Sequence, residues 1–190
     1  MSTRIATWNV NSLNVRLPHL LQWLETDPTD VVSLQETKLT DDRFPADAIK
    51  EAGWHSAWHG QKTYNGVAIV ARNPIEDVVK GIPGFEDPQA RVIAGTVNGI
   101  RNICVYVPNG QSVSSEKYAY KLEWLAALRD YMVDSLKAHD QLIVSGDYNI
   151  APTDTPFISM VEAVDATGVL HEWQTDSLAS AMEMNGVSDR

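Results

Sequence analysis

The chain has 190 residues, 44% of them hydrophobic, and a formal net charge of −10 at pH 7. This length and composition suffice for one domain with a substantial core. The negative charge argues against broad electrostatic binding to nucleic acid. It leaves open a local basic face, or a divalent cation that bridges the protein to phosphate.

The cysteine content and the N-terminus indicate a reducing compartment. The single cysteine, Cys104, excludes an internal disulfide framework. Its apolar surroundings, Asn102–Tyr106, favour a buried structural thiol over a nucleophile. Met1–Ile5 lacks the charged and then apolar build of a signal peptide, and no apolar run approaches membrane-spanning length. We therefore expect a soluble, cytoplasmic chain with no membrane partner.

Strand and helix patterns alternate in the N-terminal part of the chain. Leucines recur at helical spacing from Leu17 to Leu24, and Pro18 is expected in the first turn of that helix. In chain order, we expect a strand over Thr3–Val10, a helix from Asn14 to Thr26, a strand over Asp30–Glu36 and a short helix over Ala46–Ala52.

The middle of the chain is rich in strand patterns. Asn98-Gly99 is a strong hairpin signal between the last two of them. The expected strands are Trp54–Trp58, Gly66–Ala71, Glu76–Val79, Arg91–Val97 and Ile100–Val107.

The longest helix is expected over Ser115–Ala138, and a buried strand follows at Leu142–Val144. The opening strand–helix–strand order, then a meander, then a helix and a core strand, indicates an α/β fold with helices outside two mixed sheets. The expected buried stripe of the long helix is Tyr118, Leu122, Leu125, Met132 and Leu136, and the expected outer residues are Glu123, Arg129, Asp130 and Lys137.

Two polar residues, Asp147 and Asn149, follow the core strand with one residue between them. In an extended chain their side chains point to the same side, at the carboxyl end of the strand, where sheet proteins tend to hold ligands. The alternative is a strand that ends in ordinary turn residues, because Gly, Asp and Asn all favour turns.

Similar polar groups follow other strands, and their joint occurrence favours a functional site over separate structural roles. If the strands are neighbours, Glu36 and Asn9 meet at one edge, with Asp147 and Asn149 opposite. Hard oxygen ligands in small number suit Mg2+ far better than zinc. The early histidines, His19, His55 and His59, lack metal-ligand spacing.

Five strings in a fixed order resemble the exonuclease III family of repair nucleases, within the endonuclease/exonuclease/phosphatase superfamily. The resemblance covers the first 152 of the 190 residues. The Trp-Asn-Val-Asn-Ser and Tyr-Val-Pro-Asn-Gly strings favour its DNA-repair branch. The strings are Thr7–Leu13 with Arg16, Leu34–Lys38, Tyr64–Ile69, Tyr106–Gly110 and Gly146–Pro152.

The resemblance implies a four-layer α/β/β/α sandwich and a Mg2+ cofactor, with Mn2+ as the alternative. Glu36 is similar to the family's metal-binding carboxylate, with Asn9 beside it as a second metal residue and Asn11 near the site. Asp147 is similar to the residue that positions or deprotonates the attacking water.

The resemblance also implies the phosphate contacts. Asn149 would hold the scissile phosphate, and Tyr106 and Asn109 would contact it through their hydroxyl and amide groups. Lys38 would be either a phosphate contact or a partner for a nearby carboxylate. In such a site the metal and the amide donors offset charge on the phosphate oxygens, while a carboxylate orients water.

The implied function is that of an exodeoxyribonuclease III-like enzyme. It would hydrolyse phosphodiester bonds in double-stranded DNA at abasic sites and stepwise from 3′ ends, as a monomer. Two alternatives remain open: a phosphatase or lipid phosphodiesterase on the same fold, and an inactive fragment.

The family pattern stops after Pro152. The family continues into a late Asp and a closing Asp-His pair that contacts phosphate and helps to hold the metal, and nothing after Thr153 matches these motifs. We therefore expect residues 1–152 to be the N-terminal part of a nuclease domain, with an incomplete second half and impaired activity. Residues 153–190 would be a tail, with a helix near Phe157–Ala166 and with His171 as a surface or helix-face histidine.

Overall fold

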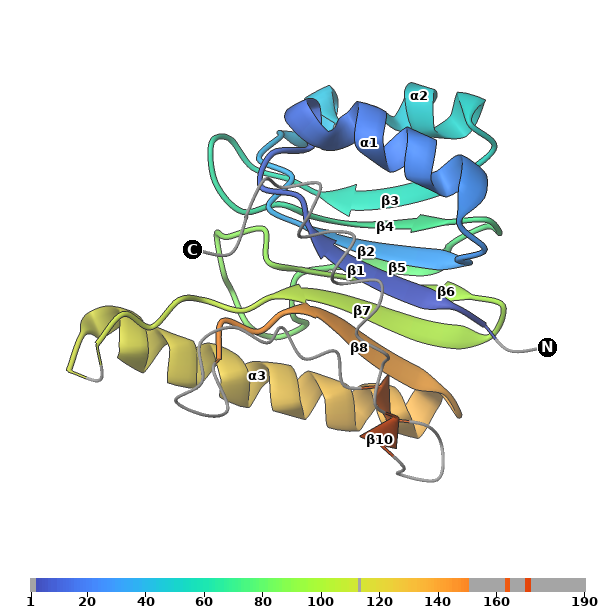
Figure 1. The fold of residues 1–190 in the computed structure, drawn as a ribbon. Coiled ribbons are helices and arrows are strands. Elements are labelled where there is room, and N and C mark those ends of the chain that lie inside the picture. Colours follow the sequence, from blue (N-terminus) through green and yellow to red (C-terminus); the bar gives the residue numbers. More distant parts are fainter. Residues whose placement is uncertain (1–2, 113, 151–162, 165–169, 172–190) are drawn as a thin grey trace.

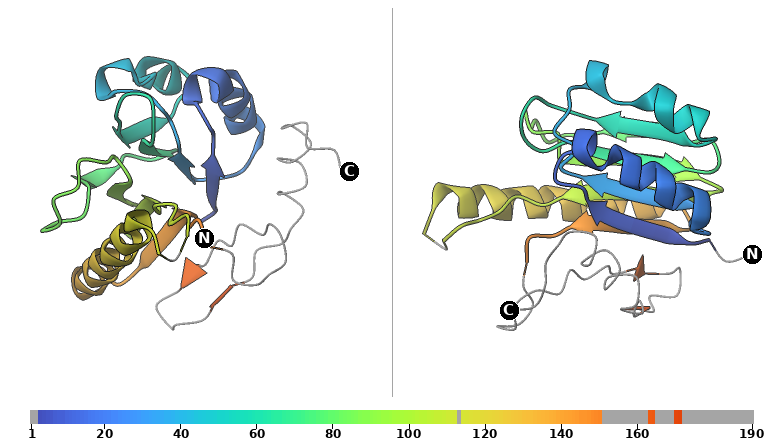
Figure 2. Two further views of the ribbon diagram at one scale, coloured as in Figure 1. Left: turned by 90° about the vertical axis from the view of Figure 1, so that its left-hand side faces the viewer. Right: turned by 45° about the horizontal axis from the view of Figure 1, so that its top comes forward.

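The computed structural model describes residues 3–112, 114–150, 163–164 and 170–171. Two four-stranded sheets pack face to face, and helices cover the outer face of each one (Figure 1). The same layers are visible in both turned views of Figure 2. The prediction of an α/β sandwich of two mixed sheets flanked by helices is therefore confirmed.

The first sheet has the strand order β1-β2-β4-β3. Its strands β1 and β2 run parallel, whereas β4 is antiparallel to both of its neighbours. Helices α1 and α2 cover its outer face, where Leu20, Leu24 and Ile49 join Leu34 and Val70 of the sheet in one buried cluster. The elements are β1 (Ile5–Asn9), α1 (Leu13–Thr26), β2 (Val31–Gln35), α2 (Ala46–Glu51), β3 (His55–His59) and β4 (Val67–Ala71), with a short 3-10 turn at Asp41–Arg43.

The second sheet has the order β5-β6-β7-β8, and only its last pair, β7 and β8, is parallel. Helix α3 covers its outer face, where Trp124 and Leu128 pack against Ile103, Val105 and Val144. The elements are β5 (Glu76–Lys80), β6 (Val92–Val97), β7 (Ile100–Tyr106), α3 (Glu116–Ala138) and β8 (Leu142–Asp147).

A buried, mostly apolar interface joins the two sheets. Ile69 of the first sheet and Ile93 of the second are fully buried in it. The Ser145 hydroxyl donates a 2.8 Å hydrogen bond to Ser33 across the interface. Cys104 is buried there as well, and burial raises the pKa of its thiol to about 11. An un-ionised, enclosed thiol is a poor nucleophile, which supports the structural role predicted for it.

Both parallel pairs bring the carboxyl ends of their strands to the same edge of the sandwich. In the first sheet Asn9 lies opposite Gln35, and in the second Tyr106 lies opposite Asp147. Residues at the ends of β1 and β2 therefore meet residues at the ends of β7 and β8. This register brings polar side chains of the two sheets together.

Several sequence expectations differ from the structure in detail. Helix α1 begins at Leu13, so Pro18 lies in its second turn and not in the first. Strand β8 runs through Ser145 and Gly146 to Asp147, whereas the sequence predicted a break at these small residues. The Asn98-Gly99 turn is confirmed, and both residues have the positive φ that a tight hairpin requires.

The stripe predicted for α3 is confirmed in part. Leu125 and Met132 pack against the core cluster under the helix, and the predicted outer residues are all exposed. Leu122 and Leu136, however, are 51% and 57% exposed, whereas Lys121, Trp124 and Leu128 are buried. The inner face of the helix includes a lysine and a serine, so the pattern of apolar residues alone misplaced part of that face.

The C-terminal expectations are tested at only a few positions. Residues 163–164 form strand β9, paired antiparallel with β10 at Leu170–His171, which contradicts the predicted helix there. The rest of that helix and the boundary after Pro152 lie outside the described residues. In the described part of the chain, no helix is long and apolar enough to cross a membrane.

Candidate active site

The side-chain amide of Asn9 links carboxylates of the two sheets. Its Nδ2 donates hydrogen bonds of 2.9 Å to Glu36 Oε1 and of 2.9 Å to Asp147 Oδ2. Its Oδ1 accepts a 3.0 Å hydrogen bond from the backbone N–H of Asn11, which fixes the orientation of the amide. The structure therefore brings Glu36 and Asp147, predicted from separate strand ends, to one nitrogen atom.

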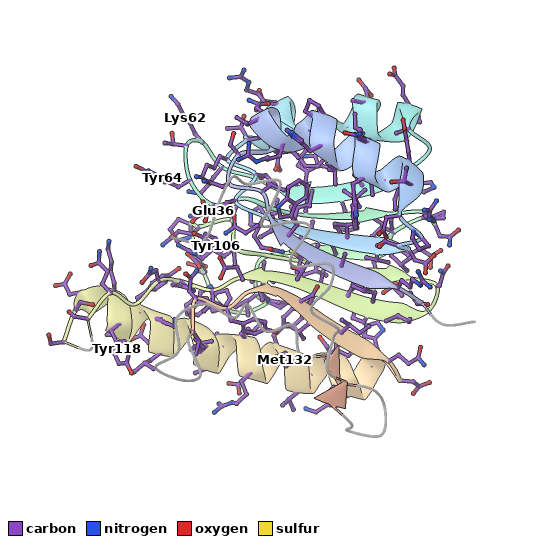
Figure 3. All side chains as sticks on the ribbon, viewed as in Figure 1. Glu36, Lys62, Tyr64, Tyr106, Tyr118 and Met132 are labelled. Atoms are coloured by element: carbon purple, nitrogen blue, oxygen red, sulfur yellow. The ribbon has the colours of Figure 1, made fainter. Side chains whose placement is uncertain are left out.

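Glu36 is the most heavily hydrogen-bonded carboxylate of the site. The Tyr106 hydroxyl donates to Oε1 at 2.9 Å, beside Asn9, and Lys38 pairs with Oε2 at 2.9 Å. Figure 3 labels Glu36 and Tyr106. Lys38 also donates to the side chain of Asn11. Burial by itself raises the pKa of Glu36, but the three donors outweigh it and leave this pKa below its ordinary value. Glu36 is thus ionised at neutral pH. We call Asn9, Glu36, Lys38, Tyr106 and Asp147 the Asn9 network.

Left-handed backbone conformations aim these side chains into the site. Glu36 and Lys38 have φ of 54° and 56°, and Asn149 has φ of 48°. Non-glycine residues adopt such angles at a cost, and they persist where the surrounding structure enforces them. Gly66 accommodates this turn, because a Cβ at that position would lie 2.2 Å from Thr37 Oγ1.

Gly146 sets the place of Asp147. Its φ is 155°, and an added Cβ would lie 1.9 Å from the carbonyl oxygen of Val105. Only glycine lets β8 approach β7 this closely at its last residue. The close approach puts Asp147 directly beside Tyr106 in the ladder.

Asn149 and Asp147 are joined by a local turn. Asp147 Oδ1 accepts a 3.0 Å hydrogen bond from the backbone N–H of Asn149. The Asn149 amide nitrogen donates to the carbonyl of Val107 at 2.9 Å, so this side chain is anchored beside the network. Lys121, which sequence reasoning missed, donates to the Asn149 carbonyl at 2.7 Å.

Lys121 is 7% exposed and comes from the inner face of α3. Burial lowers the pKa of its ammonium group, and the charge of Asp147 opposes that shift. A lysine on the apolar side of a helix could have signalled this contact in the sequence, but the predicted stripe did not include position 121. Lys121 anchors the turn that follows β8.

Tyr106 has a second neighbour that the sequence did not reveal. The guanidinium of Arg91 lies over its ring, 4.8 Å from the centroid, and donates to its carbonyl at 3.0 Å. Burial raises the pKa of the Tyr106 hydroxyl, and its hydrogen bond to Glu36 raises it further. The group therefore keeps its proton and acts as a donor.

The structure does not bring Asn109 into this arrangement. Its side chain is exposed, and its Oδ1 accepts a 3.0 Å hydrogen bond from the backbone N–H of Gln111. Of the predicted site residues, Asn9, Glu36, Lys38, Tyr106 and Asp147 form one network, and Asn149 is attached to it through Asp147.

The donor set fits an open site for a hard divalent cation. Among the described residues, no group of three or more His, Cys, Asp or Glu side chains could enclose a metal. Mg2+ commonly uses only one or two carboxylates and completes its shell with water and substrate phosphate. Glu36, ionised and at one edge of the cluster, suits that role. Asn9 offers its nitrogen to the carboxylates, so its role as a metal ligand would require the amide to turn over and stays a prediction.

The fold and the network define an α/β sandwich with an acidic, amide-lined site at the carboxyl ends of its strands. The model of the Endonuclease/Exonuclease/phosphatase family matches residues 6–180, and the chain belongs to that family. The resemblance derived from the five sequence strings is therefore confirmed.

The names of several relatives describe enzymes that act on DNA. The chain is 32% identical to the exodeoxyribonuclease III of Haemophilus influenzae over 158 residues, which cover 80% of this chain and 59% of that protein. Among solved structures, it resembles a 3′ phosphatase from Neisseria bound to a product DNA hairpin, with 51% identity, a TM-score of 0.78 and coverage of 80% and 60% of the two chains. An AP endonuclease from Archaeoglobus fulgidus is 36% identical, with a TM-score of 0.75 and the same coverage of 80% and 60%. The chain thus spans about 60% of the length of these relatives.

Proposed function

We propose that this chain carries the active-site network of an exodeoxyribonuclease III-like DNA-repair nuclease. Its substrates would be phosphodiester bonds of double-stranded DNA at abasic sites and at 3′ ends, and its cofactor Mg2+, with Mn2+ as the alternative. The observation that carries the proposal is the convergence of Glu36 and Asp147 on the amide of Asn9. The printed names of the relatives support DNA as the substrate.

The residues of the network divide the chemistry among them. Glu36 would hold the cation, which when bound would supply positive charge to the phosphate oxygens. Asp147 is an acceptor that would orient a water molecule for in-line attack and take its proton. Asn9 holds the two carboxylates in register, so neither has to be reorganised as the reaction proceeds.

The remaining donors would face the phosphate. Tyr106 keeps its proton because burial and Glu36 raise its pKa, so it can donate to a phosphate oxygen when its hydroxyl turns away from Glu36. Lys38 is close enough to Glu36 to balance its charge and, with 26% of its side chain exposed, could turn towards the substrate. Asn149 would contribute its amide after release from Val107.

The rim of the site offers a local DNA-binding face on an acidic protein. Tyr64 is 69% exposed, and it lies with Lys62 in the loop on the same side of the molecule as Glu36 (Figure 3). An exposed aromatic ring can stack on an unpaired base, and a lysine can contact the backbone. The negative net charge of the chain is compatible with DNA binding of this kind, because binding would depend on these local residues and on the cation.

A second candidate function is removal of a 3′ phosphate from DNA. The solved relative with 51% identity is described as a 3′ phosphatase bound to a product DNA hairpin. The same network serves either reaction, because in both of them water attacks phosphorus and the 3′ oxygen of the DNA leaves. The two reactions differ only in whether the attacked phosphorus carries a second ester group, which this network does not discriminate.

A substrate panel tests the proposal. The purified chain is incubated with Mg2+ and three labelled duplexes, which carry an internal abasic site, a plain 3′ end and a 3′ phosphate. We expect metal-dependent cleavage that Glu36→Gln and Asp147→Asn abolish, whereas the exposed control variants Glu51→Gln and Asp140→Asn retain it. Release of phosphate alone would favour the phosphatase. Absence of turnover on all three duplexes would refute catalysis by this chain.

A further inference from the structure

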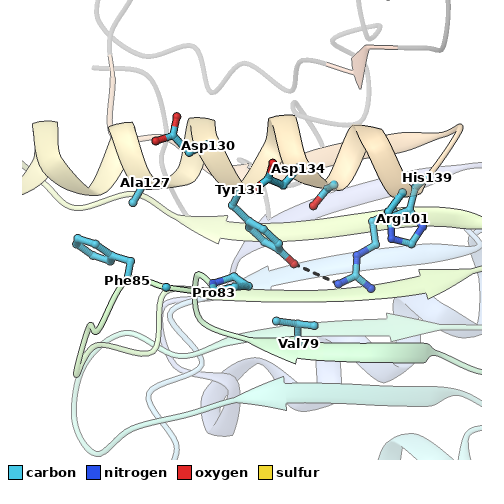
Figure 4. A pocket seen from close by; sticks show the side chains of 12 residues that line it. Val79, Pro83, Phe85, Arg101, Ala127, Asp130, Tyr131, Asp134 and His139 are labelled. Atoms are coloured by element: carbon cyan, nitrogen blue, oxygen red, sulfur yellow. Dashed lines mark hydrogen bonds between the residues drawn. The ribbon is translucent and has the colours of Figure 1, made fainter.

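A second hollow, separate from the Asn9 network, lies between α3 and the connection from β5 to β6 (Figure 4). Its volume is about 440 Å3, within the range of pockets for small organic ligands. Arg101 in its wall is near the start of β7, whereas Tyr106 of the network ends that strand. The two sites are therefore at opposite ends of the sheet.

Arg101 places a buried positive charge in this hollow. The residue is 4% exposed. Its Nη1 donates to the carbonyl of Asp77 at 2.7 Å and to Thr96 Oγ1 at 3.4 Å, and its Nη2 donates to the Tyr131 hydroxyl at 3.1 Å. All of these acceptors are uncharged. Within the described part of the chain, Nε has no hydrogen-bond partner and no carboxylate forms an ion pair with the guanidinium.

A buried cation without a counter-ion is costly, so the unpartnered Nε of Arg101 is unusual. Nε and Nη2 are neighbours on one edge of the guanidinium, and a carboxylate binds side-on to such an edge with two parallel hydrogen bonds. The hydroxyl groups of Tyr131 and Ser135 line the same hollow and can donate further hydrogen bonds to an anion.

The opposite wall of the hollow is apolar, so it favours a ligand whose anionic group is attached to a hydrocarbon part. Val79, Pro83 and Phe85 form it, facing Arg101 and Tyr131 in Figure 4. Asp130 and Asp134 also belong to the lining. Each is paired with its own neighbour on α3, and their side chains are 66% and 72% exposed. These carboxylates repel a polyanion such as DNA. A ligand with a single charge can bind at Arg101, far enough from them for the repulsion to be small.

We propose that this hollow binds a small monocarboxylate with an apolar or aromatic body. The carboxylate would accept hydrogen bonds from Nε of Arg101 and from the Tyr131 hydroxyl, and the hydrocarbon part would cover Phe85 and Pro83. This site is independent of the proposed nuclease function, because the two share no residue.

The competing explanation is that Arg101 is purely structural. It ties β5 to α3, through the carbonyl of Asp77 and the hydroxyl of Tyr131. In that case its substitution would change stability, but no carboxylate would bind in a manner that depends on it. Ligand binding, and not stability, therefore separates the two explanations.

The test uses phenylacetate and its uncharged isostere phenylacetamide, titrated into the full chain and followed by amide chemical shifts or calorimetry. We expect saturable binding of phenylacetate near Arg101 and Tyr131, with phenylacetamide weaker by about tenfold or more, as the loss of a charge-assisted pair implies. Arg101→Met and Tyr131→Phe should both weaken the binding of phenylacetate, and Arg101→Met should weaken it more strongly. Ala127→Phe, which fills the hollow and leaves Arg101 in place, should abolish binding.

Three results would overturn the proposal. They are equal affinity for phenylacetate and phenylacetamide, unchanged binding to Ala127→Phe, and inorganic phosphate binding as tightly as phenylacetate. If Arg101→Met does not fold, Tyr131→Phe and Ala127→Phe still decide the matter. Glu36→Gln, in the other site, should bind phenylacetate like the unmodified chain whether or not the nuclease proposal holds.

Discussion

The amide of Asn9 donates a 2.9 Å hydrogen bond to the carboxylate of Asp147, which lies 138 positions later in the chain. The contact joins the last residue of β1 to the last residue of β8, and thus one sheet to the other at their common polar edge. The same nitrogen also contacts Glu36. One neutral amide therefore separates two negative charges that would otherwise repel each other.

We expect Asn9→Asp to disable the site while leaving the fold intact. A third carboxylate would replace the donor that Glu36 and Asp147 share, so three carboxylates would repel one another where one amide now bridges two. Loss of a preorganised donor typically costs about a hundredfold in rate, and the turnover on abasic-site DNA should fall by at least that much. Asn98→Asp, at the exposed hairpin turn, is the control and should retain activity. Equal turnover by both variants would contradict the role of Asn9.

Glu36 should make stability depend on pH in acid. Burial raises its pKa, but hydrogen bonds from Asn9, Lys38 and Tyr106 lower it below the ordinary value of 4.5. A pKa that is lower in the folded state adds stability above the unfolded pKa, and this stability is lost as the pH falls through the folded pKa. The difference in unfolding free energy between the unmodified chain and Glu36→Gln should therefore shrink from about pH 6 to pH 3.

Urea unfolding across that pH range measures this difference. Glu51→Gln, which removes an exposed carboxylate on α2, provides the control and should show a smaller dependence. A difference for Glu36→Gln that stays constant, or that grows in acid, would show that its donors do not favour the ionised form.

Gly146→Ala should be among the most damaging small substitutions in the chain. A Cβ there would lie 1.9 Å from the Val105 carbonyl oxygen, so β8 would have to move away from β7 and carry Asp147 with it. We expect a loss of about 2–4 kcal/mol in unfolding free energy, together with loss of turnover. Gly81→Ala is the matched control, because Gly81 also has a positive φ but has nothing within 4 Å of an added Cβ. It should cost about 1 kcal/mol. Thermal melts of both variants check the prediction.

Lys121→Met should separate activity from stability. Removing a buried ammonium group whose pKa is lowered by burial should cost little stability or increase it. The turn at Asn149 would lose its 2.7 Å anchor, so Asp147 would be held less firmly. We expect turnover to fall by about tenfold or more, with the melting temperature within a few degrees. Lys117→Met, on the exposed side of α3, should leave turnover unchanged. A parallel loss of stability and activity would instead indicate a structural role.

Tyr64→Ala should affect DNA binding and not the chemical step. The ring is 69% exposed and contributes little to the core, so the melting temperature should be unchanged. Loss of one stacked base typically costs about 1–3 kcal/mol of binding energy, which corresponds to an increase in KM or Kd of about fivefold or more. Tyr64→Phe, which keeps the ring, should bind DNA like the unmodified chain. An unchanged Kd for Tyr64→Ala would place the DNA elsewhere.

The local features of the fold could be predicted from the sequence. The patterns of apolar residues marked the strands β1 to β7 to within two residues, and Asn98-Gly99 marked the hairpin, whereas β8 ends three residues later than predicted. Those signals are local, because hydrophobic period and turn chemistry act over a few neighbouring residues. The polar residues at strand ends, including Glu36 and Asp147, were recognisable for the same reason.

The partners of those residues were decided only by the tertiary structure. Which face of α3 is inside depends on packing against β7 and β8, so Lys121 was assigned to neither the core nor the site. Asn109 belongs to one of the strings that resemble the family, yet its side chain is exposed and accepts a hydrogen bond from the backbone N–H of Gln111. Among the described residues, Nε of Arg101 lacks a partner in a place where β5, β7 and α3 meet around the guanidinium. Contacts between residues far apart in the chain depend on sheet order and register, which a pattern of single residues does not specify.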